Sequence, residues 1–192
     1  MNYLGHLVLS GLNEDILFGN FIADAIKGSS FKVWPEEIQS GILLHRYIDS
    51  FTDTHSLYLT SKRRFYSNYP KISGVITDIL YDHLLICNWD KHVDICVDDF
   101  ISRSYQILDK RKHQMPDKIR FMYRYMRRDN WLKNYKYEDG IRRALSGIGK
   151  RTGFGEHIHE AFEVFKVDPD IFLNEFDEFF LELSIRSKVF LR

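Results

Sequence analysis

Apolar residues recur at intervals of three and four along most of the chain, the spacing of one face of an α-helix. The run from Ile72 to Ile86 shows this clearly, with apolar side chains at 72, 75, 76, 79, 80 and 84. Near the end of the chain, a wide apolar stripe is formed by Phe172, Phe176, Phe179, Phe180 and Leu183. No segment shows a convincing set of the period-two alternations typical of half-buried strands. The pattern therefore predicts an all-α fold.

Start and stop signals divide this pattern into about seven or eight helices. Asn13 and Asp168 are suitable N-caps, and Pro35, Pro116 and Pro169 stand where a helix would begin. The expected helices run over about 13–27, 35–51, 54–69, 72–89, 95–113, from 116 onward, around 141–148, and 168–187.

The length and composition fit a single domain spanning residues 1–192. Hydrophobic residues make up 44% of the sequence, enough for a sizeable core, and no repeat or linker divides the chain. The expected architecture is a single-domain helical bundle. The two cysteines suggest no disulfide framework, and we see neither a signal peptide nor an apolar run of membrane-spanning length. A soluble cytoplasmic protein is expected.

The formal net charge of zero hides an uneven distribution. Residues 110–151 hold 14 basic and 4 acidic side chains, a net charge of +10, between two acidic segments. This block predicts a surface that binds an acidic partner. The alternative interpretation is a solvent-exposed helix face whose positive charge is balanced by the acidic flanks. The candidate contact residues are Arg127, Arg128, Arg142 and Arg143. The neutral pI and acidic flanks argue against nucleic-acid binding.

Several acids and histidines interrupt the apolar helical runs. Asp78 and Asp82 are four residues apart, as are His45 and Asp49, so each pair lies on one helix face. A buried carboxylate without a partner is costly, so such groups usually have a cation or a hydrogen-bond donor. The full set of candidates is His6, Asp24, His45, Asp49, Asp78, Asp82 and His83.

Each of these residues alone has a simple structural explanation, as a hydrogen-bonded core histidine or an acid paired with arginine. Together they lie on three or four expected elements within the first 83 residues. Carboxylates and imidazoles converging from separate elements can hold a divalent metal ion for hydrolysis. We therefore expect Asp24, His45, Asp82 and His83 to meet around one point.

At this stage the motifs resemble a known family, the acyl carrier protein phosphodiesterases. The resemblance covers most of the chain and thins after about residue 150. It rests on the segments Met1–Leu7, Gly19–Asp24, Gly41–Asp49, Thr52–Asp53 and Asp78–Leu84, with weaker likeness in Asn130–Tyr135 and Gly140–Leu145.

This resemblance implies a helical fold distantly related to HD-domain phosphohydrolases. It implies removal of the 4′-phosphopantetheine arm from holo acyl carrier protein, an acidic protein, with manganese favoured over magnesium or iron(II). It also implies site roles for the matched residues. The implied metal ligands are His6, Asp24, His45, Asp78, Asp82 and His83.

A phosphodiester is negatively charged and water is a poor nucleophile, so further groups are needed around the metal. Asp24 or Asp49 is expected to orient water or to accept its proton. Arg46, next to His45, is a candidate for binding the phosphate. The chain lacks the usual order of HD-domain ligands, because its one adjacent His–Asp pair is reversed as Asp82–His83.

Two alternative functions stay open from the sequence. The first is an HD-like phosphohydrolase acting on a nucleotide or another small phosphoester, which would not need the basic block. The second is a non-catalytic helical binding module. Metal content distinguishes the binding module from the two enzymes. Comparing activity on holo acyl carrier protein with activity on small phosphodiesters distinguishes the two enzymes from each other.

Overall fold

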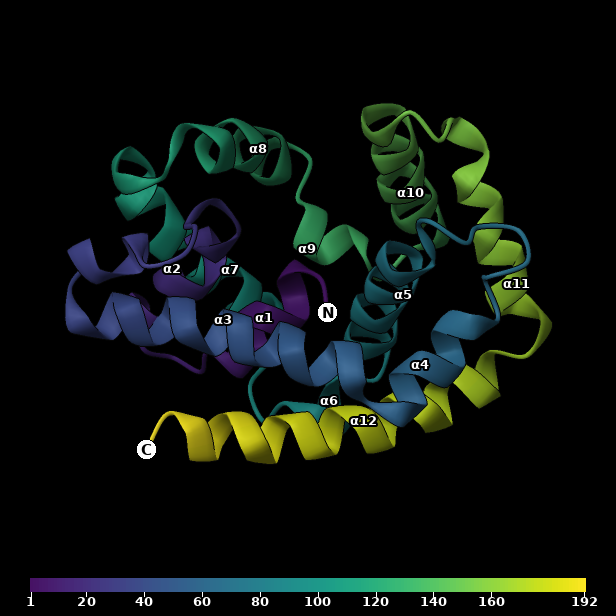
Figure 1. Ribbon diagram of the computed structural model, residues 1–192, viewed down its shortest axis with the longest axis horizontal. Coiled ribbons are helices and arrows are strands. Elements are labelled where there is room, and N and C mark those ends of the chain that lie inside the picture. The colour runs from purple at the N-terminus through teal and green to yellow at the C-terminus, as the bar shows by residue number, and fades with distance from the viewer.

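The recurring apolar positions lie on helix faces that meet in one continuous core. The structure, a computed structural model, describes residues 1–192 and contains only helices, turns and loops (Figure 1). The α-helices are α1 Tyr3–Leu9, α2 Glu14–Ile22, α3 Glu36–Thr54, α4 Ser56–Arg63, α5 Ser73–Cys87, α6 Trp89–His92, α7 Val97–Arg111, α8 Asp117–Arg128, α9 Trp131–Asn134, α10 Glu138–Thr152, α11 Ala161–Val167 and α12 Pro169–Phe190. Short 3₁₀-helices cover Ala23–Ala25, Ser30–Val33, Lys112–Gln114 and Glu156–Glu160.

The all-α prediction is confirmed, but the expected number of seven or eight helices is wrong, because there are twelve. The additional helices α1, α6, α9 and α11 have only four to seven residues. Two turns or fewer are too short to show a helical period, and their stability comes from packing against the rest of the protein. None of the helices is both long and apolar enough to cross a membrane.

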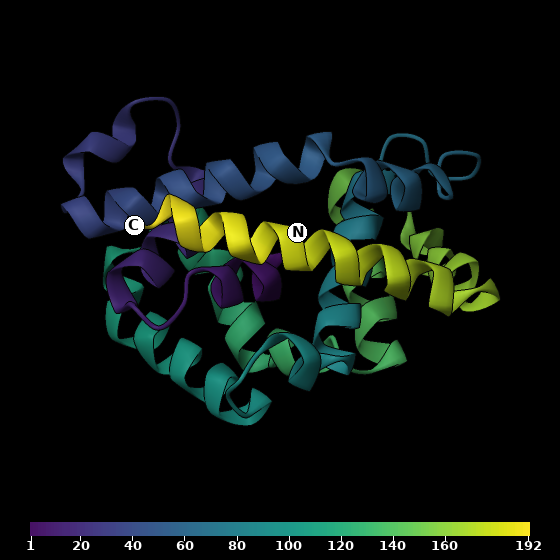
Figure 2. The same ribbon diagram turned by 90° about the horizontal axis from the view of Figure 1, so that it is seen from below.

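The long helix α12 lies along α3 and α4 and closes one side of the core (Figure 2). Its Phe179 ring contacts the rings of Phe51, Tyr58 and Tyr81, which come from α3, α4 and α5. The apolar stripe recognised in the sequence therefore joins three helices to α12.

Helices α2 and α3 cross at unusually short range through two glycines. A Cβ atom on Gly19 would lie 2.2 Å from the carbonyl oxygen of Ile38, and one on Gly41 would lie 2.2 Å from that of Ile16. Only glycine fits such a backbone approach. The crossing brings Asn20 of α2 against α3, and His45 follows Gly41 by one helical turn.

Helices α8 and α10 stand apart on either side of α9, as Figure 1 shows. The first residues of the chain lie next to α9, where the Asn2 amide donates to the Tyr135 hydroxyl. A cleft of about 1400 Å³ opens here. Its lining includes residues of α1, α2 and α3 together with residues of α8, α9 and α10.

Candidate metal centre and its cleft

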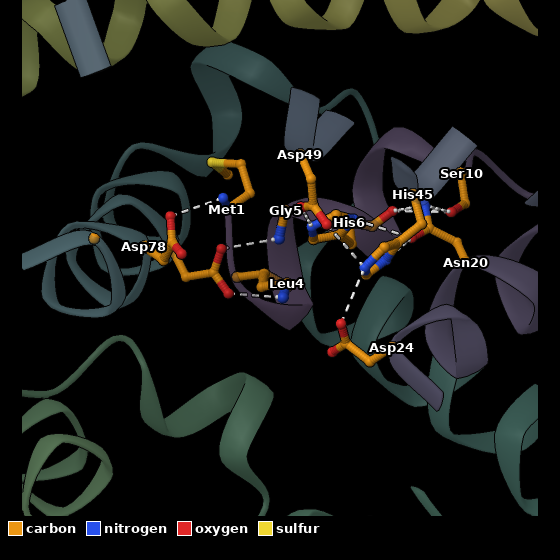
Figure 3. Close-up of polar contacts among 12 residues, drawn as sticks. Met1, Leu4, Gly5, His6, Ser10, Asn20, Asp24, His45, Asp49 and Asp78 are labelled. Carbon is orange, nitrogen blue, oxygen red and sulfur yellow. Dashed lines mark hydrogen bonds and ion pairs between the residues drawn. The ribbon is translucent and has the colours of Figure 1, made fainter. Parts of the chain in front are cut away.

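Two histidines and an aspartate from α1 and α3 meet in the cleft (Figure 3). His6 Nε2 lies 3.2 Å from Asp49 Oδ1, and His45 Nε2 lies 3.2 Å from Asp49 Oδ2. The two imidazole rings stack with their centroids 4.1 Å apart. Each of the three residues offers one ligand atom, and these atoms all lie within 4.8 Å of one another.

Asp24 adds a second carboxylate to this cluster. It lies on the 3₁₀-helix Ala23–Ala25 that extends α2, and its Oδ1 atom is 3.4 Å from His45 Nε2. Its side chain is 56% exposed, so it faces the open cleft rather than the core. Four of the candidates chosen from the sequence therefore lie together: His6, Asp24, His45 and Asp49.

Asn20 lies behind the two imidazoles and is fully buried. Its Oδ1 atom is 3.0 Å from Nδ1 of His6 and 3.0 Å from Nδ1 of His45. Its amide group donates to the carbonyl oxygen of His6 and to Oγ of Ser10. Sequence reasoning did not select Asn20, although it is a lone amide within the apolar run Leu17–Ile22.

The cluster shifts the pKa of each of its members. Burial opposes protonation of His45, but hydrogen bonds with Asp24 and Asp49 outweigh it and raise its pKa to about 9. Burial and the neighbouring His45 charge lower the pKa of His6. The hydrogen bond from His45 lowers the pKa of Asp24, and the contacts with both histidines overcome burial to hold the pKa of Asp49 well below its usual range. A proton is therefore held between His45 and two carboxylates.

These groups fit a divalent metal ion by their chemistry. Two imidazole nitrogens and a carboxylate form a donor set that suits manganese, iron or zinc. A cation placed among them would replace the proton that His45 otherwise holds. His6, His45 and Asp49 are the residues that would hold it, with Asp24 beside them.

The structure does not place Asp82 in this cluster, contrary to the expected convergence. The fully buried Asp82 carboxylate accepts hydrogen bonds from the backbone N–H groups of Leu4 at 2.7 Å and Gly5 at 3.0 Å. It therefore caps the N-terminus of α1, where the Asn2 side chain makes no cap. Burial raises the pKa of Asp82 to about 7, against the lowering effect of these two donors.

Asp78, one turn before Asp82, is also engaged in structural contacts. Its Oδ1 atom accepts from the amino group of Met1 at 2.9 Å (Figure 3). The same atom accepts from the Tyr58 hydroxyl, also at 2.9 Å. These contacts explain a half-buried acid in an apolar helix without a metal ion, although Asp78 also lines the cleft.

His83 likewise points away from the cluster. Its Nδ1 atom lies 2.7 Å from the carbonyl oxygen of Tyr135, and its ring packs edge-on against Phe162 and Phe165. The ring therefore joins α5 to Tyr135, directly after α9, and to α11. Asp82 is turned toward α1 and His83 toward Tyr135, so these two neighbours point to different sides of α5.

Arg46, expected to bind phosphate, instead holds a loop. Its guanidinium donates to the carbonyl oxygens of Ile26 at 3.0 Å and Gly28 at 2.9 Å. It also lies over the ring of Phe31, 5.1 Å from the centroid. The adjacent His45 lines the cleft, whereas the Arg46 guanidinium is held by the loop around Ile26 and Gly28.

Three of the four candidate partner-binding arginines are paired within the protein. Arg127 pairs with Asp109, Arg128 with Asp129, and Arg142 with Glu138 and Glu163. Arg143 makes no ion pair within 4.0 Å and lines the cleft. The other cationic residues of that lining are Lys27, Lys118 and Arg151.

Comparison with known proteins identifies the family of the chain. The family model described as acyl carrier protein phosphodiesterase matches residues 1–183. No solved structure matches the chain, so the expected likeness to HD-domain proteins stays a prediction.

Curated relatives carry the same name. A protein named acyl carrier protein phosphodiesterase from Yersinia pestis is 34% identical over 153 residues, covering 79% of each chain. Its namesake from Photorhabdus laumondii is 32% identical over 152 residues, 79% of this chain and 77% of that protein. A third, from Enterobacter sp. (strain 638), is 24% identical over 189 residues, 98% of each chain. The chain belongs to the acyl carrier protein phosphodiesterase family.

Proposed function

We propose that this chain hydrolyses the phosphodiester that joins the 4′-phosphopantetheine arm to a serine of holo acyl carrier protein. The observation that carries the proposal is the cluster of His6, His45 and Asp49 in an open cleft of a chain of this family. Water contributes its hydroxyl group to phosphorus, and the bond from phosphorus to the serine oxygen breaks. The serine oxygen takes up a proton, so that the apo protein and the phosphorylated arm are released.

A divalent ion bound at the cluster would lower the pKa of water and offset charge on the phosphoryl oxygens. The imidazoles and Asp49 would hold the ion, which leaves Asp24 as the cleft-facing carboxylate. The Asp24 carboxylate is 56% exposed and lines the cleft beside the cluster, within reach of a water molecule there. Its main role is therefore to orient the attacking water through a hydrogen bond to its carboxylate.

The donor set supports manganese or iron(II) over magnesium at this site. Magnesium prefers oxygen ligands and keeps several waters, whereas imidazole nitrogens suit later divalent metals. Two of the three clustered ligand atoms are imidazole nitrogens. Manganese, which the family resemblance favours, is the metal we propose.

An acidic carrier protein would dock at the mouth of the cleft. Arg143 and Arg151 of α10 and Lys118 of α8 all line the cleft. Opposite fields speed encounter and orient the partners. We assign partner binding to these three residues and to Lys27, in place of Arg127, Arg128 and Arg142.

The test compares hydrolysis of holo acyl carrier protein with that of small phosphodiesters, after chelation and reloading with Mn²⁺. We expect His45→Gln and Asp24→Asn to lose activity on the carrier protein. His92→Gln is a matched control, because His92 also pairs with an aspartate, Asp177, but outside the cleft. Full activity of both site variants would refute the proposed centre.

The same assay separates the alternative functions. A preference for small phosphodiesters over the carrier protein would favour the small-molecule phosphohydrolase. No hydrolysis of any substrate by the Mn²⁺-loaded wild type would favour the binding module.

A further inference from the structure

One amide side chain contacts both imidazoles of the cluster. The two Nδ1 atoms of His6 and His45 each lie 3.0 Å from the same oxygen atom, Oδ1 of Asn20. Asn20 is fully buried in α2, and neither histidine is more than 9% exposed. No water can substitute for these contacts without a rearrangement of the packing.

The surroundings of Asn20 fix which end of its amide faces the histidines. Its Nδ2 atom lies 3.0 Å from the carbonyl oxygen of His6, a group that can only accept a hydrogen bond. Nδ2 also lies 2.8 Å from Ser10 Oγ, whose own hydrogen is donated to that same carbonyl. Turning the amide over would place its oxygen against a carbonyl oxygen. The oxygen of Asn20 therefore faces the imidazoles, and both Nδ1 atoms must carry hydrogen.

We propose that Asn20 is a positioning residue that holds both histidines in the Nδ1–H form, so that both Nε2 lone pairs face the metal position. The inference rests on the proposed function, because it concerns the same centre. A neutral imidazole carries one hydrogen, so a hydrogen fixed on Nδ1 leaves Nε2 free to bind a metal ion. Both Nε2 atoms lie on the side of Asp49, at 3.2 Å from its oxygens.

One acceptor serving two ligands also sets the angle between them. Each ring is restrained at its Nδ1 end by Asn20 and by stacking on the other ring at 4.1 Å. Hydrogen-bond partners of metal-bound histidines typically change metal affinity by about 10- to 100-fold when they are removed. Since Asn20 acts on two ligands together, its removal is expected to cost affinity at the upper end of this range.

The test uses the whole protein and two readouts besides activity. The first is the affinity for Mn²⁺ measured by titration calorimetry on metal-free protein. The second is a long-range ¹H–¹⁵N spectrum of the protein loaded with Zn²⁺, which identifies the coordinating nitrogen of each histidine. For the wild type we expect coordination through Nε2 and a retained hydrogen on Nδ1 of both His6 and His45.

Two variants separate positioning from simple packing. Asn20→Leu keeps the approximate size but removes the acceptor, and its Kd for Mn²⁺ should rise by about 100-fold. Ser10→Ala removes one partner of the Asn20 amide and leaves the acceptor in place. It should lower the melting temperature while changing the Kd by less than the roughly 10-fold that loss of a direct hydrogen-bond partner of a metal-bound histidine typically causes.

A third variant covers the possibility that Asn20→Leu fails to fold. Asn20→Asp keeps an oxygen acceptor for both Nδ1–H groups, and its second oxygen, when protonated, replaces Nδ2 as the donor to the His6 carbonyl. It should therefore retain Nε2 coordination in the zinc-loaded spectrum. Coordination through Nδ1 in the wild type, or an unchanged Kd in folded Asn20→Leu, would overturn the inference. Failure of the wild type to bind either metal would instead refute the proposed centre itself.

Discussion

Gly41 of α3 lies against the backbone of Asn20 in α2, so closely that a Cβ atom on Gly41 would stand 2.9 Å from the Asn20 nitrogen. The same atom would stand 2.2 Å from the Ile16 carbonyl oxygen. The missing side chain at position 41 thus sets the distance between the helix that carries Asn20 and the helix that carries His45. Backbone packing and the geometry of the candidate metal centre are therefore coupled.

Replacing Gly41 with alanine should force α2 and α3 apart. We expect a loss of stability of about 1–3 kcal/mol, the usual range for overpacking, together with weaker Mn²⁺ binding. Chemical denaturation and titration calorimetry measure the two effects. Gly147→Ala is the matched control, because a Cβ atom at this exposed position in α10 meets nothing within 4 Å. It should stabilise the protein by up to about 1 kcal/mol through helix propensity. Equal effects of the two substitutions would contradict the coupling.

Replacement by alanine should reduce stability at Asp82 and activity at Asp24. Asp82→Ala leaves the N–H groups of Leu4 and Gly5 without acceptors, at a cost of about 2–4 kcal/mol. Its folded fraction should still bind Mn²⁺. Asp24→Ala should stay folded, since this carboxylate is more than half exposed, but it should lose hydrolysis. A stable Asp82→Ala protein that no longer binds metal would restore Asp82 as a candidate ligand.

The stability of the metal-free protein should depend on pH through His45. Its pKa in the folded protein, about 9, is above its ordinary value of 6.5, so the folded state holds the proton more tightly. This contribution is complete below pH 6.5 and is lost as the pH rises through 9. Asp24 and Asp49 are 56% and 46% exposed, so solvent screens their attraction to His45. We therefore expect the protonation of His45 to stabilise the folded protein by only about 1–2 kcal/mol.

The measurement is the difference in unfolding free energy between the wild type and His45→Gln, followed by urea denaturation from pH 6 to pH 10. The difference should shrink across the interval from 6.5 to 9. A difference that stays constant over this range would show that Asp24 and Asp49 do not hold a proton on His45.

Charge reversal should distinguish the arginines that line the cleft from those that form ion pairs within the protein. Arg143→Glu with Arg151→Glu should raise KM for the holo carrier protein more than for a small phosphodiester, because both residues line the cleft. The effect should weaken with added salt, since exposed charges are screened beyond about 8 Å at physiological ionic strength. Arg127→Glu with Arg128→Glu is the control, and it should mainly alter stability by breaking the pairs with Asp109 and Asp129. Equal effects of both double variants would assign docking to the whole basic block.

The sequence could predict the helical class and the longer helices because those have several turns of apolar period. It could not predict α1, which has seven residues and receives its N-terminal cap from Asp82, far away in the chain. For the same reason Asp82 looked like a metal ligand: a buried carboxylate in an apolar run has the same sequence signature whether it faces a cation or a helix N-terminus. His83 was similarly ambiguous, because its partner is a backbone carbonyl, that of Tyr135, which no side-chain pattern reveals.

Within the candidate site, spacing alone could pair His45 with Asp49 on one face of α3. The contact of these residues with His6 depends on how α1 packs, and the shared bond to Asn20 depends on the glycine crossing of α2 and α3. Both contacts are tertiary: they join different helices, and the sequence pattern of one helix does not show which other helix it packs against. Arg46 adjoins His45 in sequence, yet the helical turn directs it to Ile26 and Gly28 instead.

The most direct test of the candidate metal centre is anomalous diffraction from crystals of the wild-type protein grown with Mn²⁺ and without chelator. The account predicts one strong anomalous peak bounded by His6 Nε2, His45 Nε2 and the Asp49 carboxylate, at about 2.0–2.3 Å from the ligand atoms. No peak at that position, or a peak held by Asp82 and His83, would contradict it.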